Sequence, residues 1–186
     1  MILDEDLARF FGIRPRPVDD IVYGTDDPDE LAGRDGNDSL FGEDGSDRLY
    51  GGSGNDQLEG GDDSDRIYGG VGNDRIAGGD DQGDGPIVVV GNRLTAFNVP
   101  DILTGGDGRD TFAFDGDDDD HDLITDFQRG RDRLEIFDVG PGDITQISIK
   151  SGIYGKGLLI LTDGDNGLFL QDVRGTLNVG TDIVFV

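Results

Sequence analysis

The most constraining feature of the sequence is a nine-residue period that covers residues 15–113. Rows of nine counted from residue 24 read GTDDPDELA, GRDGNDSLF, GEDGSDRLY, GGSGNDQLE, GGDDSDRIY and GGVGNDRIA. Position six is Asp in nine of the eleven rows, and position eight is apolar in ten of them. The rows covering residues 78–95 break this pattern without changing its count, and AFNVPDILT and GGDGRDTFA then resume it. A fixed period of this kind predicts a fold of stacked repeats.

Each row combines glycine and turn-forming residues with one aliphatic residue, which predicts a turn of about six residues followed by a short strand. The position-eight side chain points inward, because neighbouring residues of a strand alternate between its two faces. Two rows make one coil, and stacked coils form two parallel sheets around a thin aliphatic seam. The predicted seam residues are Val22, Leu31, Leu40, Leu49, Leu58, Ile67, Ile76, Leu94, Leu103 and Phe112.

The position-six aspartates make such a stack electrostatically unfavourable without a counter-ion. They are Asp20, Asp29, Asp38, Asp47, Asp56, Asp65, Asp74, Asp101 and Asp110. Aspartates one coil apart lie about 4.8 Å from each other and repel by roughly 3.5 kcal/mol at an effective dielectric of about 20. Calcium reverses the sign of this interaction, because it accepts several carboxylate and carbonyl oxygens at once. We therefore expect several Ca²⁺ ions between the turns, with metal binding and folding in one equilibrium.

Composition excludes several other classes of site and partner. The chain has no Cys and one His, so thiolate and multi-histidine metal sites are excluded. A net charge of −26 predicts no nucleic-acid partner and no binding to anionic membranes. Neither a membrane-spanning segment nor an N-terminal signal peptide is recognisable. The catalytic signatures HExxH and GxSxG are absent, and His121 follows DGDDDD, where we expect a solvated bystander. We predict no enzymatic activity for these residues.

The rows closely resemble the RTX (repeat-in-toxin) nonapeptide GGxGxDxUx, and GGSGNDQLE and GGVGNDRIA match it at every specified position. The resemblance implies an all-β fold, a right-handed parallel β-roll. It also implies a division of calcium ligands between two stacked turns. One turn contributes its Asp and the carbonyls of positions two and four. The turn one coil later contributes its Asp and the carbonyls of positions one and three.

Carried onto this sequence, the family pattern implies three well-defined ion sites. The first would use Asp38 and Asp56 with the carbonyls of Arg34, Gly36, Gly51 and Ser53. The second would use Asp47 and Asp65 with those of Glu43, Gly45, Gly60 and Asp62. The third would use Asp56 and Asp74 with those of Gly52, Gly54, Gly69 and Val71. The pairs Asp29–Asp47 and Asp20–Asp38 fit less well, because their first rows lack the usual glycines.

The C-terminal third is similar to the end of serralysin-type secreted proteases, through GGDGRDTFAF and HDLITDFQRGRDRLEI. In that segment Asp122, Asp126 and Asp132 are candidates for further ligands. From residue 134 onward, RLEIF, QISIK, GLLILT and GLFLQDV predict antiparallel strands, with a hairpin turn at DGDNG, that cap the roll. The final TDIVFV is similar to the uncleaved signal of substrates of type I (ABC) secretion.

Together these features predict three regions. Residues 1–14 are a cap or the remnant of an upstream domain, residues 15–113 are the roll with an insertion at about 80–99, and residues 114–186 are the β-rich cap with its secretion signal. The predicted function is a secreted, extracellular calcium-binding module that folds after type I export. Two alternatives stay open: the C-terminal module of a secreted protease, lipase or polysaccharide epimerase, and a calcium-dependent module that binds an extracellular polysaccharide.

Overall fold

The structure is a computed structural model that describes residues 17–79, 88–90, 93–96, 101–115, 121–152, 155–162 and 167–186. Every regular element in these ranges is a β-strand. No helix in the described ranges is long and apolar enough to cross a membrane. The N-terminal cap expected at residues 1–14 lies outside the described residues, as do most of the insertion and the DGDNG turn.

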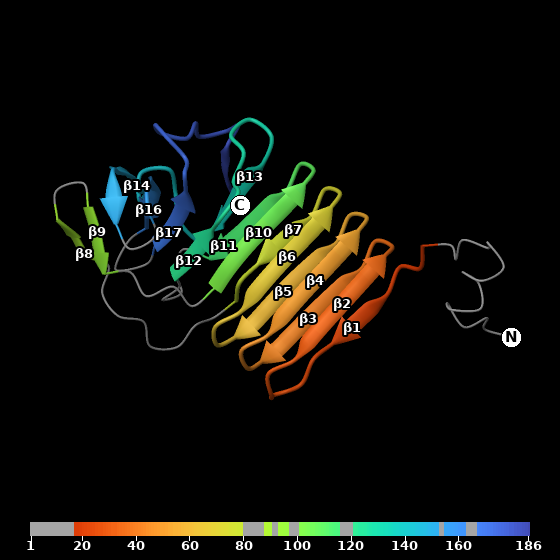
Figure 1. Cartoon of the computed structure of the whole chain (residues 1–186). Helices are drawn as coiled ribbons and strands as arrows, with labels where there is room; N and C mark the ends of the chain where they lie inside the picture. The colour runs from red at the N-terminus through yellow and green to blue at the C-terminus, as the bar shows by residue number, and fades with distance from the viewer. Residues whose placement is uncertain are drawn as a thin grey trace, which may run out of the picture.

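Two sheets lie back to back and make up most of the molecule (Figure 1). The seven-stranded sheet contains, in spatial order, β1 (Ile21–Tyr23), β3 (Ser39–Asp44), β5 (Gln57–Asp62), β7 (Arg75–Ala77), β11 (Thr111–Asp115), β13 (Arg133–Phe137) and β18 (Ile183–Phe185). The eight-stranded sheet contains β2 (Glu30–Asp35), β4 (Arg48–Ser53), β6 (Arg66–Val71), β10 (Asp101–Asp107), β12 (His121–Ile124), β17 (Gly167–Gln171), β16 (Gly157–Leu161) and β14 (Thr145–Ile149). The chain alternates between the two sheets from β1 to β7, which is the predicted coil.

Strand pairing in the roll follows the eighteen-residue coil. Leu40 of β3 pairs with Leu58 of β5, and Leu49 of β4 pairs with Ile67 of β6, in parallel. Their side chains are at most 1 % exposed and form the seam. Of the other seam residues, Ile76, Leu103 and Phe112 are equally buried, whereas Val22 and Leu31 of the outermost strands are partly exposed. The predicted parallel β-roll is therefore confirmed.

The eighteen-residue spacing between paired strands is first broken after β7. Ile67 of β6 pairs with Leu103 of β10, and Ile76 of β7 pairs with Phe112 of β11, so these partners are separated by two coils of sequence. Leu94, which the period places in the seam, lies instead in β9 (Arg93–Ala96). That strand belongs to a separate three-stranded sheet with β8 (Val88–Val90) and β15 (Ser151–Gly152). The prediction for Leu94 was wrong because the nine-residue period only counts residues. It could not show that β10 and β11 stack directly on β6 and β7, so that the residues between them form no coil of the roll.

The C-terminal part contains the predicted antiparallel strands, with one difference. β14 pairs with β16, and β16 with β17, in antiparallel register. The segment RLEIF, expected to be antiparallel, is β13 and pairs in parallel with β11 on one side and β18 on the other. It does so because Leu134 and Ile136, both fully buried, continue the seam beyond Phe112 and Phe114. Parallel stacking therefore extends past residue 113 and into the C-terminal part.

Candidate calcium-binding turns

The turns of the roll form two rows, one at each edge of the sheets. We call them edge I and edge II by their position-six aspartates. Turns of edge I lead from the eight-stranded to the seven-stranded sheet and contain Asp20, Asp38, Asp56, Asp74 and Asp110. Turns of edge II lead back and contain Asp29, Asp47, Asp65 and Asp101. The nine-residue frame thus places all nine aspartates at strand starts, in two columns.

Seven of these aspartates are buried, and they are joined by backbone hydrogen bonds along each edge. On edge I the Asp38 N–H donates to Oδ1 of Asp56 at 2.8 Å, and the Asp56 N–H donates to Oδ1 of Asp74 at 2.9 Å. Across the register change the Asp74 N–H donates to Oδ1 of Asp110 at 3.0 Å. Edge II repeats the pattern from Asp29 through Asp47 and Asp65 to Asp101. The side chain of Asp20 is exposed and that of Asp29 is half-buried. These two residues belong to the first coil of the described chain, so no earlier coil covers them.

The second carboxylate oxygen of each buried aspartate is where a cation fits. Oδ2 is buried without a hydrogen-bonding partner in Asp38, Asp47, Asp56, Asp65, Asp74 and Asp110. A carboxylate oxygen left in that state costs several kcal/mol. A methyl group built on Gly51 would lie 2.5 Å from Oδ2 of Asp56 and 2.5 Å from the Gly69 carbonyl oxygen of the next coil. Carboxylate and carbonyl oxygens therefore converge on a space that only glycine leaves open, which is a donor set suited to a hard cation.

The electrostatics of the turns agree with this geometry. Burial is the main cause that raises the pKa of Asp65 to about 8 and that of Asp74 to about 7, and repulsion from neighbouring carboxylates contributes to both values. Burial also raises the pKa of Asp47, Asp56 and Asp110. In each of them a backbone N–H donor opposes the increase. A proton and a cation therefore compete for the same oxygens.

Positions two and four of the turns take left-handed backbone conformations. Position two has φ of 112° in Gly52 and 111° in Gly70, and position four has 137° in Gly54 and 141° in Gly72. Non-glycine residues at these positions adopt the same region: Arg34 at 82°, Glu43 at 75° and Asp63 at 72°. Such backbone is unfavourable for L side chains. The stacking of neighbouring coils therefore overrides local preference in those three residues.

The carbonyls nominated by the family pattern fall into three groups. The position-one carbonyls face Oδ2 of the aspartate in the preceding coil; they are those of Gly51, Gly60 and Gly69. The position-three carbonyls of Ser53, Asp62 and Val71 accept N–H groups at 2.8–3.1 Å from Gly36, Gly45 and Gly54 respectively. The carbonyls of Arg34, Gly36, Glu43, Gly52 and Gly54 lie against the Cα of the glycine one coil later.

Beyond the repeats, the three candidate ligands differ from one another. Both oxygens of Asp132 accept backbone N–H groups, Oδ1 from Asp110 and Oδ2 from Gln128. Both oxygens of Asp126 likewise accept N–H groups, from Gly105 and Gly106. Asp122 is 3 % exposed and pairs in register with Asp101 across β12 and β10. Oδ1 of Asp122 lies 2.9 Å from a methyl group built on Gly78.

Sequence reasoning missed two sets of residues and misjudged one. Asparagines at position five of edge I form a ladder in which each side-chain Oδ1 accepts the N–H one coil later, from Asn37 to Asn55 and from Asn55 to Asn73. Their spacing of eighteen was visible in the rows. Asp182 is buried and accepts N–H groups from Gly130 and Asn178. No local sequence pattern predicts this. His121, expected to be solvated, is 2 % exposed because β12 lies inside the eight-stranded sheet.

No group of three or more His, Cys, Asp or Glu side chains is gathered in a metal-binding cluster within the described ranges. The turns instead bring together two carboxylates of successive coils with backbone carbonyls. A sequence comparison agrees with this geometry: the family described as RTX calcium-binding nonapeptide repeat (4 copies) matches residues 23–58 and 50–83. Residues 23–83 therefore match the pattern of RTX calcium-binding nonapeptide repeats. Nonapeptides of this family bind calcium and are a non-catalytic repeat module.

Among solved structures, the chain is similar to the extracellular lipase LipA from Serratia marcescens. The identity is 17 %, with a TM-score of 0.35 over 89 % of this chain and 40 % of the lipase. The chain therefore spans less than half of the lipase. No curated protein matches the chain.

Proposed function

We propose that residues 17–186 form an extracellular calcium-binding module that folds when calcium fills the turns of its RTX repeats. The observation that carries the proposal is the set of buried aspartate oxygens that have no hydrogen-bonding partner and face glycine carbonyls. In the apo chain these groups oppose folding through desolvation and mutual repulsion. Calcium bound only to the folded state would stabilise it by mass action.

The proposed ions lie between aspartates of successive coils on one edge. Pairs eighteen residues apart are Asp20–Asp38, Asp29–Asp47, Asp38–Asp56, Asp47–Asp65 and Asp56–Asp74. The hydrogen bonds across the register change add two pairs at twice that separation, Asp65–Asp101 and Asp74–Asp110. The role of the ion there is electrostatic: it neutralises two carboxylates and links two coils.

The coupling to export follows from the same electrostatics. In a calcium-poor cytoplasm, repulsion and glycine entropy keep the repeats expanded. After export through a type I system, calcium would drive folding outside the cell, where the terminal TDIVFV has already served as the signal. Calcium-driven folding outside the cell would explain why the repeats are strongly acidic and why the chain contains no Cys for disulfide bonds.

A calcium titration tests the proposal, with circular dichroism for β-content and native mass spectrometry for the number of ions. We expect β-content to rise with calcium, and the first block of repeats to take up about five ions. Magnesium at the same concentration is the control and should be less effective, because it prefers a tighter octahedral shell. Equal β-content in chelator and in excess calcium would contradict the proposal.

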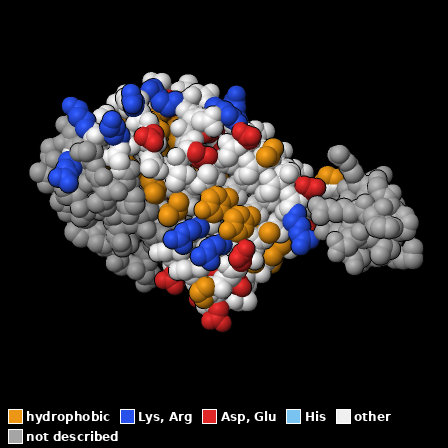
Figure 2. Space-filling model, viewed as in Figure 1, with side chains coloured by type: hydrophobic (Ala, Val, Ile, Leu, Met, Phe, Trp, Pro, Cys, Tyr) orange, Lys and Arg blue, Asp and Glu red, His pale blue; other side chains and the backbone are white. Residues whose placement is uncertain are grey.

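A specific surface favours the polysaccharide-binding alternative as a second function. On the outer face of the eight-stranded sheet, Arg48 of β4 stands beside Arg66 of β6, and Tyr50 stacks on Tyr68 with ring centroids 5.3 Å apart. Neither guanidinium has an ion-pair partner within the described ranges, although Glu30 lies across from Arg48. Figure 2 shows basic and hydrophobic side chains side by side on this face.

Two adjacent arginines beside flat aromatic rings fit a polymer that carries both carboxylates and sugar rings. Arginine recognises carboxylates in a bidentate manner, and the rings offer an apolar platform. We therefore expect the calcium-loaded protein to bind soluble polygalacturonate but not neutral dextran. Arg48→Gln with Arg66→Gln should abolish binding, whereas Arg109→Gln, on an exposed turn, should not. Equal binding of single-stranded DNA would indicate general anion binding instead.

A further inference from the structure

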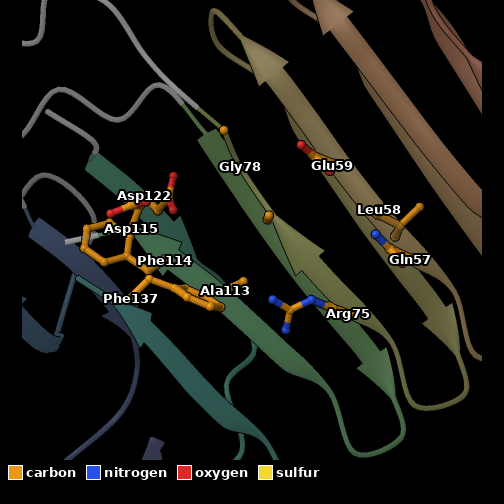
Figure 3. Close-up of a pocket in the computed structure, with 12 residues that line it drawn as sticks. Gln57, Leu58, Glu59, Arg75, Gly78, Ala113, Phe114, Asp115, Asp122 and Phe137 are labelled. Carbon is orange, nitrogen blue, oxygen red and sulfur yellow. The ribbon is translucent and has the colours of Figure 1, made fainter. Parts of the chain in front are cut away.

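The first coil of the roll exposes apolar side chains at positions where the later coils have polar ones. Val18, Ile21 and Tyr23 are 59 %, 68 % and 63 % exposed. Ile21 begins a column of paired residues on the seven-stranded sheet in which every later member is polar: Ser39, Gln57, Arg75, Thr111 and Arg133. Figure 3 shows two of these, Gln57 and Arg75, on neighbouring strands. The apolar residue at the start of the column distinguishes the first coil from the middle of the stack.

The other two exposed residues extend the same surface. Val18 lies at position four of its row, where the next coils on edge I have glycine: Gly36, Gly54 and Gly72. Tyr23 stacks on Phe41 with ring centroids 5.0 Å apart, so the apolar surface continues from β1 onto β3. The seam residue Val22 is partly exposed at the same place. We call the surface formed by Val18, Ile21, Tyr23 and Phe41 the open end of the roll.

The backbone at the open end also lacks a neighbour. β1 and β2 are the outermost strands of the two sheets (Figure 1). In the next coil the Ser39 N–H donates to the Asp20 carbonyl of the coil before it, at 2.8 Å. The corresponding N–H of the first coil, that of Ile21, has no earlier coil within the described ranges. Stacked-repeat proteins need caps at their ends, and exposed strand edges otherwise pair with other chains. We therefore expect a further element to cover the open end.

The charge of the first coil limits what this element can be. Residues 17–31 contain no Lys or Arg and six acids, namely Asp19, Asp20, Asp26, Asp27, Asp29 and Glu30. A second copy of the chain placed on the open end would bring the same set of acids against the first set, and the two sets would repel each other. The element that covers the open end should therefore combine apolar side chains, which cover Ile21 and Tyr23, with basic groups that face the acids.

We propose that residues 7–16 of this chain, LARFFGIRPR, dock on the open end and cap the roll. They lie outside the described residues, and their sequence has the required chemistry. The segment contains no acid, and its large apolar and basic side chains are Leu7, Phe10, Phe11 and Ile13, and Arg9, Arg14 and Arg16. Apolar burial holds the segment on β1, and the arginines offset the charge of the first coil. Of the two roles that the sequence leaves open for the N-terminal region, this is the cap.

The connection between the segment and the roll places it beside the surface that it would cover. The Val18 N–H donates to the Asp35 carbonyl at the end of β2 at 3.0 Å, so the chain is fixed on the roll two residues after Arg16. Ten residues span up to about 35 Å when extended. A six-residue strand such as β2 is about 20 Å long. The segment is therefore long enough to follow the open end, and its tether gives it a high effective concentration there.

Hydrogen exchange read by mass spectrometry tests the docking in the full chain at saturating calcium. In the wild type, residues 7–16 should exchange at least about tenfold more slowly than a free peptide of the same sequence. Phe10→Ser with Phe11→Ser should remove this protection and speed up exchange in β1 roughly tenfold, with β5 and β6 unchanged. The matched control, Asp4→Ser with Glu5→Ser, changes polar residues outside the docked segment and should behave as the wild type. Exchange of residues 7–16 at the free-peptide rate in the wild type would refute the proposal.

A second pair of variants tests the role of charge. Arg14→Gln with Arg16→Gln should lower the protection of residues 7–16 at low ionic strength, and the loss should be smaller in about 1 M NaCl, where the Debye length is about 3 Å. The matched control, Lys150→Gln with Lys156→Gln, removes the same charge from exposed positions of the C-terminal part and should have no effect. Equal losses from both pairs would refute a contact between these arginines and the first coil.

Sedimentation velocity distinguishes the N-terminal segment from a second copy of the chain. We expect the wild type to be a monomer at saturating calcium. Ile21→Ser with Tyr23→Ser should then release residues 7–16 to the free-peptide exchange rate in a protein that stays monomeric. A wild-type dimer that dissociates in this double variant would identify a second copy on the open end and overturn the proposal.

Discussion

The roll and the C-terminal cap bury different things. Each nonapeptide of the roll buries one aliphatic side chain, such as Leu58, together with one carboxylate, such as Asp56. In the cap, β16 and β17 are buried almost along their whole length, with Leu158, Leu159, Phe169 and Leu170 at most 1 % exposed. The cap therefore has apolar area to fold on, whereas we propose that the roll depends on a counter-ion.

The buried carboxylates show the same difference. Asp182 in the C-terminal part accepts N–H groups with both oxygens, Oδ1 from Gly130 and Oδ2 from Asn178. Asp56 in the roll satisfies only Oδ1, through the Asp38 N–H. A carboxylate with both oxygens satisfied needs no metal, and one with a single oxygen satisfied does. Burial alone therefore does not separate the two groups of aspartates, and we propose that a carboxylate oxygen without a hydrogen-bond donor marks a calcium ligand.

Removing calcium should have the largest effect on the difference between the roll and the cap. Each site occupied at 100 times its Kd adds about 2.7 kcal/mol to stability, so emptying five sites removes an amount comparable to the whole stability of a typical domain. We expect a chelator to abolish amide-exchange protection in β3–β6 and to leave more protection in β16–β17. Hydrogen exchange read by mass spectrometry measures both regions in one sample. Equal loss in both would show that the cap has no stability of its own.

Single aspartates test whether the roll is continuous across its interruption. From spacing alone, Asp56 serves two pairs and Asp74 only one, so replacing Asp56 should cost more. The structure corrects this expectation, because the Asp74 N–H donates to Asp110 and Asp74 is therefore flanked on both sides. We expect Asp56→Asn and Asp74→Asn each to remove up to about 5 kcal/mol at 100-fold excess calcium, since each empties two sites.

The calcium concentration at the folding midpoint, followed by circular dichroism, measures this effect. Asp20→Asn should shift the midpoint least, because the Asp20 side chain is exposed, and Asp44→Asn, at the exposed end of β3, is the neutral control. If Asp74→Asn resembled Asp20→Asn instead of Asp56→Asn, the stack would end at β7.

The period predicted most of the roll because every coil repeats the same local problem. Leu40, Leu49, Leu58 and Ile67 had to face inward once the turns were recognised, and their aspartates had to stack. The partner of Asp65 was not predictable in the same way. Asp101 is thirty-six residues away, and the coil between them is bypassed although its length keeps the count. Which strand pairs with β6 depends on the free energy of the whole stack of coils and not on the local sequence.

Predictions from local composition failed where long-range packing decides the environment. DGDDDD suggested solvent around His121, yet β12 lies between β10 and β17. RLEIF has the alternation of any half-buried strand, and such alternation does not reveal whether the partner runs parallel or antiparallel. The candidate carbonyl ligands of the turns came from the family pattern alone, and no physical rule applied to this sequence would have selected them.

Acid should stabilise the calcium-free roll. Burial raises the pKa of Asp65 to about 8 and of Asp74 to about 7, from 3.8 in the unfolded chain. Because the folded apo state binds more protons than the unfolded state between these values, its stability rises as the pH falls from 8 towards 4. In chelator we expect part of the β-sheet signal of the roll to return at pH 5.

The sign reverses for calcium, because protons then compete with the ion: the calcium midpoint should rise as the pH falls. Circular dichroism at pH 5 and pH 8, each with and without calcium, gives the four values. A chelated roll that is less folded at pH 5 than at pH 8 would show that the buried aspartates are charged in the apo fold.

The smallest effect concerns the part of the roll that needs no ion. Asn55 accepts the Asn73 N–H at 2.8 Å and donates its own N–H to Asn37, within a ladder that follows edge I only. Asn55→Ala removes one exposed acceptor, so we expect a loss of about 0.5–1.5 kcal/mol at saturating calcium with no change in ion count. Asn55→Asp keeps the acceptor and should lose less. Ser64→Ala is the matched control, because Ser64 holds position five on edge II outside this ladder. Urea unfolding in excess calcium measures the three variants. If Asn55→Ala also lost an ion, the ladder would belong to the calcium sites, and the roll would have no polar scaffold separate from its ions.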